Sequence, residues 1–91
     1  MLKSVEGVIL DLSTLVPICH VSKKGYWRDS GNAFTTEIDL FVKDGRYFVH
    51  ELWNQHDQER KSEHWFERSK DSAVDLMNLA HLEDDKIIQY V

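Results

Sequence analysis

The sequence has few of the residues that cross-link or interrupt a chain. Its 91 residues include one cysteine, Cys19, one proline, Pro17, and four glycines. A lone cysteine excludes a disulfide within the chain, so we expect a fold held by its core in a reducing, cytoplasmic compartment. So little proline and glycine leaves no room for a long disordered linker, and we expect one domain over residues 1–91.

Long apolar runs are missing as well. A membrane-spanning helix needs roughly 20 consecutive apolar residues, and no segment of the sequence approaches that length. The apolar stretch near the N-terminus is interrupted by Glu6 and Asp11, and no small-residue cleavage site follows it. The sequence therefore predicts neither a membrane anchor nor a secretory signal peptide.

Patterns that carry chemistry are scarce. Gly25 and Gly31 lie in turn-like contexts and not in a phosphate-binding loop. The histidines show neither the i, i+4 spacing of a helical metal site nor the paired spacing of zinc ligands; they are His20, His50, His56, His64 and His81. No serine or cysteine nucleophile can be placed beside one of them. We expect a non-catalytic protein with no metal and no cofactor.

One short segment is similar to a known catalytic motif. Residues 7–16 form an apolar run that ends at Asp11 and is followed by Thr14 and Leu15. This resembles the first motif of the haloacid-dehalogenase-type phosphatases, in which Asp11 would match the nucleophile. Ser13 stands where that family has its acid–base aspartate, and the motif's glycine is missing. The resemblance covers ten residues and implies a magnesium-dependent hydrolase on a parallel α/β sheet, for which the chain has too few predicted helices.

The acidic charge is concentrated in the C-terminal third. Residues 57–85 contain nine acids and four bases, which accounts for the whole net charge of −5. Nucleic-acid binding depends on concentrated lysine and arginine, so we do not expect a nucleic-acid partner. An acidic surface would instead suit a protein with a basic surface.

A β-hairpin over about residues 33–54 is the strongest structural prediction. Two runs of β-branched and aromatic residues flank Asp44-Gly45, a pair typical of two-residue hairpin turns. With that turn, one face carries most of the apolar groups and the other pairs Phe41 with Phe48 and Asp39 with His50. A turn that begins at Lys43 and contains a bulge would shift the pairing by one residue and exchange the faces of the second strand. We favour the two-residue turn because it places more apolar residues on one face.

The remaining elements follow from turn residues and apolar spacing. Ser69 is the predicted N-cap of a helix over about residues 70–82, which should stop close to His81. We expect strands at residues 7–12, 15–21, 63–68 and 86–91, turns at 23–25 and 29–32, a short extended piece at 26–28, and a loop at 55–62. Because Pro17 cannot donate a hydrogen bond, the strand that contains it should be an edge strand. The fold class is therefore α+β, with an antiparallel sheet of four to five strands and one C-terminal helix packed on one face.

This architecture leaves the second face of the sheet to be covered. The N-terminal segment, a second copy in a homodimer, or a partner could cover it. We therefore interpret the chain as a small acidic protein-binding module, by size and charge similar to inhibitors and to immunity or anti-defence proteins that occlude a partner surface. Its contact residues would be either Phe41 and Phe48 or an acidic set consisting of Glu63, Glu67, Asp71 and Asp75.

Two alternatives remain open at this point. One is a protein that binds a small ligand or nucleotide as a homo-oligomer, with Trp27, Arg28 and Trp53 as stacking and charged groups. The other, more remote, is a magnesium-dependent phosphatase-like hydrolase that uses Asp11.

Overall fold

The chain forms six strands in two antiparallel sheets and two short helices. The computed structural model describes all residues except 27–30, 32 and 56–59. The elements in order are β1 (Leu2–Val5), β2 (Val8–Asp11), β3 (Cys19–Tyr26), β4 (Ala33–Lys43), β5 (Arg46–Gln55), β6 (Arg60–Arg68), α1 (Lys70–Leu79) and α2 (Asp84–Tyr90). Strands β1 and β2 pair with each other, while β3-β4-β5-β6 form a four-stranded sheet in sequence order. Neither described helix is long and apolar enough to cross a membrane.

The β4–β5 hairpin has the predicted two-residue turn. Asp44 and Gly45 have φ angles of 53° and 74°, which is the left-handed conformation that such turns require. Leu40 lies opposite Val49, and Phe41 lies opposite Phe48. The predicted register is therefore confirmed, and with it the assignment of side chains to the two faces of the sheet.

Helix α1 covers one face of the sheet. Ser69 caps it by accepting a hydrogen bond from the Ser72 N–H at 3.2 Å, as the sequence predicts. Its buried residues Ala73, Leu76 and Met77 belong to a core cluster that also contains Val21, Ile38, Leu40, Tyr47 and Val49. Ile87 and Tyr90 of α2 pack against the same cluster. The principal core is therefore built between the two C-terminal helices and the central strands.

The N-terminal hairpin covers the opposite face. Val5 and Leu10 form a second core cluster with Phe48, against which Trp65 also packs. Lys43 adds a polar contact, because its Nζ donates to the Ile9 carbonyl at 2.7 Å. Of the three coverings that the sequence left open, the structure therefore uses the N-terminal segment of the same chain. Strand β2 was predicted, whereas its partner β1 was not.

Two expectations about the strands were wrong. Residues 23–25 were expected to form a turn, but they belong to strand β3, which pairs with β4 as far as Tyr26. Gly25 is used there for close packing, because a Cβ at this position would lie 2.5 Å from the ring of Phe34. The expected loop at 55–62 is shorter than predicted, since β5 includes Gln55 and β6 begins at Arg60.

The C-terminus also differs from the expected structure. Residues 86–91 were predicted to form a strand, but most of them lie in helix α2. Asp84 and Asp85 occupy its first turn, where the positive end of the helix dipole favours acidic residues. The same acids had been read as the end of the preceding helix, which in fact stops at Leu79 and is followed by His81 with φ 61°. The expected turn at 29–32 and the extended piece at 26–28 fall mostly outside the described residues.

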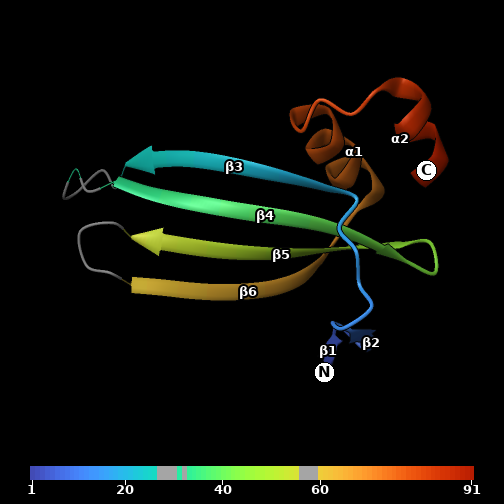
Figure 1. Cartoon of the computed structure of the whole chain (residues 1–91), viewed down its shortest axis with the longest axis horizontal. Coiled ribbons are helices and arrows are strands. Elements are labelled where there is room, and N and C mark those ends of the chain that lie inside the picture. Colours follow the sequence, from blue (N-terminus) through green and yellow to red (C-terminus); the bar gives the residue numbers. More distant parts are fainter. Residues whose placement is uncertain (27–30, 32, 56–59) are drawn as a thin grey trace.

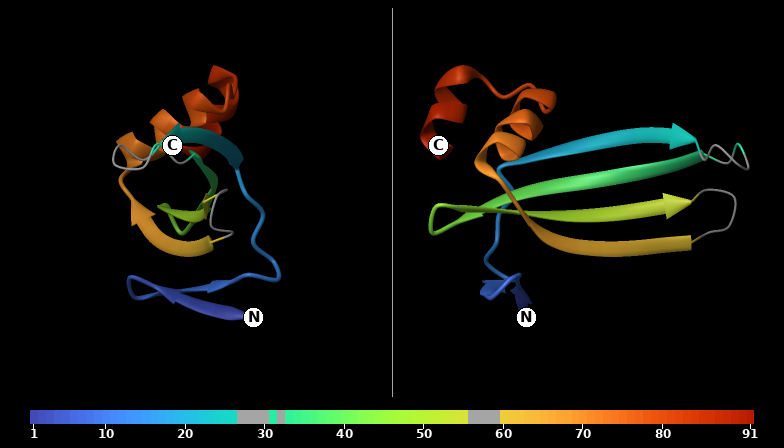
Figure 2. Two further views of the ribbon diagram at one scale, coloured as in Figure 1. Left: turned by 90° about the vertical axis from the view of Figure 1, so that its left-hand side faces the viewer. Right: turned by 180° about the vertical axis from the view of Figure 1, so that it is seen from behind.

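The sheet extends beyond both of the layers that cover it. The molecule measures 41 × 31 × 19 Å, and both helices and the β1–β2 hairpin gather towards one end of the long strands (Figures 1 and 2). We call the opposite part the arm, comprising residues 23–26, 33–36, 53–54 and 61–62. Within it Thr36 is buried by neighbouring side chains, and the other described residues are half-buried or exposed. The arm therefore belongs to neither core cluster.

The neighbours Ile9 and Leu10 test the packing of the N-terminal hairpin. Leu10 is fully buried, whereas Ile9 is 58% exposed. Leu10→Ala should lower the free energy of unfolding by about 2–5 kcal/mol, because it leaves a cavity beside Phe48. Ile9→Ala should change it by less than about 1 kcal/mol. Urea unfolding measures both values, and equal effects of the two substitutions would contradict this packing.

Candidate functional site

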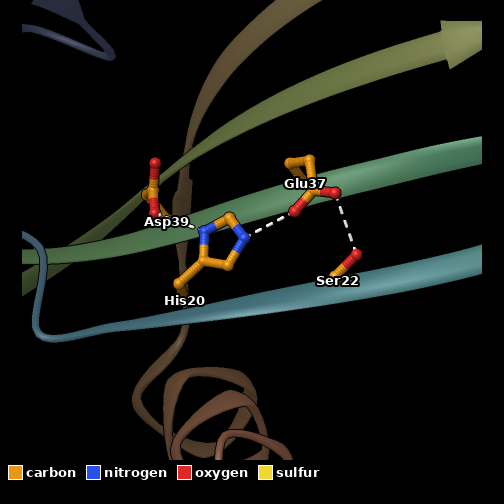
Figure 3. A network of polar contacts seen from close by, with 4 residues as sticks. All are labelled: His20, Ser22, Glu37 and Asp39. Carbon is orange, nitrogen blue, oxygen red and sulfur yellow. Dashed lines mark hydrogen bonds and ion pairs between the residues drawn. The ribbon is translucent and has the colours of Figure 1, made fainter.

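A network of four polar side chains crosses strands β3 and β4 on the face opposite α1. His20 pairs with Asp39 and Ser22 pairs with Glu37 in the register of the two strands. Residues two apart on a strand point to the same side, so all four side chains project together. Figure 3 shows His20 between the two carboxylates, with Ser22 on the far side of Glu37.

Each ring nitrogen of His20 contacts a carboxylate. Nδ1 lies 2.7 Å from Asp39 Oδ1, and Nε2 lies 2.5 Å from Glu37 Oε2. Ser22 Oγ donates to the other oxygen of Glu37 at 2.9 Å. Ionised carboxylates only accept hydrogen bonds, so both contacts are satisfied when His20 carries a hydrogen on each nitrogen. The geometry therefore favours the imidazolium form.

The pKa values of the network follow from these contacts. The hydrogen bond with Asp39, followed by that with Glu37, raises the pKa of His20 above its ordinary value, although partial burial opposes the shift. The hydrogen bond from Ser22, followed by that from His20, lowers the pKa of Glu37. Burial, with a smaller effect from Asp39, raises the pKa of the Cys19 thiol, which therefore favours its protonated form.

The arrangement does not match that of a nucleophilic triad. In a triad the serine hydroxyl donates to the histidine, which then takes its proton. Here Ser22 donates to Glu37, and the imidazole nitrogen that would accept the proton already contacts the same carboxylate. The network is instead a charged clasp that joins edge strand β3 to β4.

A second polar contact continues the network across the sheet. Nε2 of His50 lies 2.9 Å from Glu63 Oε1, and the His50 ring lies over Trp65 with 4.5 Å between centroids. Glu63 also accepts a hydrogen bond from Trp65 Nε1 at 3.0 Å. The Trp65 and His50 hydrogen bonds together lower the pKa of Glu63. Both histidines of this row thus use carboxylates from neighbouring strands.

The predicted pair Asp39–His50 is only half realised. The two residues face each other in the register, as predicted. Asp39 nevertheless contacts His20, while His50 contacts Glu63. The roles of His20, Ser22 and Glu37 were missed, because residues 23–25 were read as a turn. Reading residues 19–26 as one continuous strand would have placed His20 beside Asp39.

The predicted apolar anchors lie inside the protein. Phe41 is 7% exposed and Phe48 is fully buried, beneath the N-terminal hairpin. Phe41 also stacks on Trp65 with 5.7 Å between ring centroids. These two rings therefore contribute to the core and offer no open surface to a partner in this structure.

The four acids proposed as a charged contact are not gathered on one surface. Glu67 receives two hydrogen bonds from Arg46, at 2.8 and 2.6 Å, and Glu63 contacts His50. Both are on the sheet face opposite α1, whereas Asp71 and Asp75 are exposed on α1 itself. Two of the charges are thus balanced locally, and the other two lie on a different layer.

The alternative ligand site can be described only in part. Trp27 and Arg28 lie outside the described residues. Trp53 lies in the arm on the α1 side of the sheet, where its ring stacks against Phe34 at 6.3 Å and meets the edge of His64 at 5.7 Å.

Asp11, the residue behind the phosphatase-like reading, has a local structural role. Its Oδ1 accepts hydrogen bonds from the backbone N–H and the hydroxyl of Ser13, at 3.1 and 2.6 Å. It ends β2 in an antiparallel hairpin, and all described strand pairs are antiparallel. The parallel sheet that the resemblance implies is therefore not found among them.

Comparisons with known proteins add no functional information. No protein-family model, no curated protein and no solved structure matches the chain. Among the described residues, no group of histidine, cysteine and carboxylate side chains is arranged to hold a metal ion. Any assignment of function therefore depends on the surfaces and charges of this structure.

The charged clasp predicts a pH dependence of stability. Because the pKa of His20 is raised, its contribution is fully present below the unfolded value of about 6.5 and is lost as the pH rises through the folded value. The lowered pKa of Glu37 adds stability above about 4.3, which is lost as the pH falls through its folded value. The advantage of the wild type over His20→Gln should therefore be greatest between these limits and should shrink above them.

Urea unfolding of both proteins across the pH range measures this difference. The effect should be small, because the His20 side chain is 50% exposed and solvent screens its ion pairs. Asp39→Asn provides the control, since removing its charge should reduce the pH dependence that His20 contributes. A difference between wild type and His20→Gln that stays constant from acid to alkaline pH would rule out the clasp.

Proposed function

We propose that this protein is a small non-catalytic protein-binding module that uses the arm to occlude a surface of its partner. The observation that carries the proposal is the extension of the four-stranded sheet beyond both covering layers. Sheets in small domains normally bury at least one face, and uncovered sheet surface commonly marks an interaction site. The arm thus has the size and shape of an element inserted into, or laid against, another protein.

The side chains of the arm suit a protein surface. Tyr26 is 74% exposed, and an aromatic ring with a polar tip is a frequent anchor in protein interfaces. Lys23, Lys24 and Lys61 are also exposed in the arm. The matching partner surface would combine an apolar pocket with carboxylates. This differs from the basic partner expected from the total charge, because the acids of α1 and α2 lie at the other end of the molecule.

The edges of the sheet offer a second means of contact. Strands β3 and β6 each have one neighbour among the described strands, so their outer edges carry backbone groups that no other described strand pairs. An extended segment of a partner can add to such an edge through main-chain hydrogen bonds. The charges of β3 and β6 limit uncontrolled pairing of this kind, which is consistent with a specific partner.

Photo-crosslinking from two exposed positions tests this function. A photoreactive amino acid at Tyr26 should capture a protein of one discrete mass from a lysate of the native host. The same group at Ile88, which is 71% exposed on α2, should not capture it. Excess unlabelled wild-type protein should abolish the adduct, whereas excess Tyr26→Asp should not, because the anchor ring is missing.

Two results would contradict the arm as the contact surface. The first is a discrete adduct from position 88 with none from position 26. The second is equal competition by the wild type and Tyr26→Asp, which would show that the captured protein does not depend on the arm.

A further inference from the structure

A cavity of about 360 Å³ lies at the end of the molecule opposite the arm. It is bounded by the β4–β5 turn, the end of β6, the start of α1 and the end of α2. The side chains relevant to its chemistry are Arg46, Tyr47, Glu67, Arg68, Lys70 and Tyr90. Three of these are cations and one is a carboxylate, so the lining carries a net charge of +2 in a chain whose net charge is −5.

The two arginines are held in place but keep donors free. Arg46 uses Nε and Nη2 to bind both oxygens of Glu67, which leaves its Nη1 for another acceptor. Arg68 donates from Nη1 to Ser72 at 3.2 Å and from Nη2 to Glu51 at the long distance of 3.4 Å. Its Nε is buried and has no hydrogen-bond partner among the described residues. The guanidinium of Arg68 is thus positioned by its neighbours and incompletely satisfied by them.

Lys70 adds a charge without a structural partner. It is exposed at the first position of α1, and its side chain makes no printed hydrogen bond or ion pair with the described residues. The hydroxyl of Tyr47 donates to the Tyr90 carbonyl at 2.5 Å, which joins the sheet to α2 and fixes the wall of the cavity. The cavity therefore combines a firm wall with cationic groups from three different elements.

We propose that this cavity binds a small phosphorylated ligand through its phosphate group. A phosphate monoester presents three acceptor oxygens and close to two negative charges, which three cations from separate directions can share. The planar guanidinium forks suit two of those oxygens, and the lysine supplies a point charge. The volume is at the lower end of the range for small-molecule sites, about 300–1,000 Å³, and leaves room for a modest substituent beside Tyr47 and Tyr90. This binding is independent of the protein contact at the arm.

Titration with inorganic phosphate and with phenyl phosphate tests the site. Amide chemical shifts of the ¹⁵N-labelled protein are followed at constant ionic strength, with sodium chloride replacing the added salt. Saturable shifts should appear at Arg46, Arg68 and Lys70 with both phosphates. Lys70→Gln should weaken binding about tenfold, the effect expected from loss of one charged contact. Lys70→Arg should restore most of the affinity.

Lys86→Gln is the matched control, since it removes an exposed lysine from α2, outside the cavity lining. It should change the affinity by less than about twofold, corresponding to 0.4 kcal/mol. The proposal is overturned if chloride alone produces the same shifts, or if Lys86→Gln weakens binding as much as Lys70→Gln. Binding of acetate as tight as that of phosphate would overturn the choice of phosphate, and failure of phenyl phosphate to bind would overturn the assignment to a phosphate monoester.

Discussion

The two-residue turn at Asp44–Gly45 is the constraint on which the rest of the structure depends. Side chains alternate along a strand, so a shift of one residue would move every side chain of β5 to the other face. In the observed register, Leu40 and Val49 face α1, while Phe41 and Phe48 face the N-terminal hairpin. Each face thus receives a compatible apolar surface, and each is covered by a different part of the chain.

The same register positions the polar groups. Asp39 and Glu37 lie on the face opposite α1 because Ile38 and Leu40 are required in the core. Once β3 pairs with β4, His20 is held between these two carboxylates. The clasp is therefore a consequence of packing on the other side of the sheet, and it stabilises an edge strand that few apolar contacts hold.

Local signals account for what could be predicted from the sequence. The hairpin, its register, the Ser69 cap and helix α1 each depend on residues close together in the chain. Strand β1 and the full length of β3 depend on distant partners, and Gly25 suggested a turn although it makes room for Phe34. Helix α2 was misread because Ile87 and Tyr90 are also good strand formers, and only packing against the core decides between the two. The clasp was missed for the same reason, since it joins residues 17 to 19 positions apart.

The molecule has two ends of different character. Both cores, both helices and the cationic cavity lie at one end, and the uncovered arm lies at the other. Segments with few buried contacts open locally at a lower free energy than the core of the same domain. A binding surface on the arm would therefore be adaptable while its base stays rigid, which suits a partner that orders the arm on contact.

Hydrogen exchange followed by mass spectrometry tests this division most directly. The account predicts that backbone amides in residues 38–42 and 47–50 exchange only through global unfolding. Amides in residues 33–36 and 53–54 should exchange at least about tenfold faster, through local opening with a lower free energy. Equal protection along the whole length of β4 and β5 would contradict the account, because the arm would then be as firmly held as the covered half of the sheet.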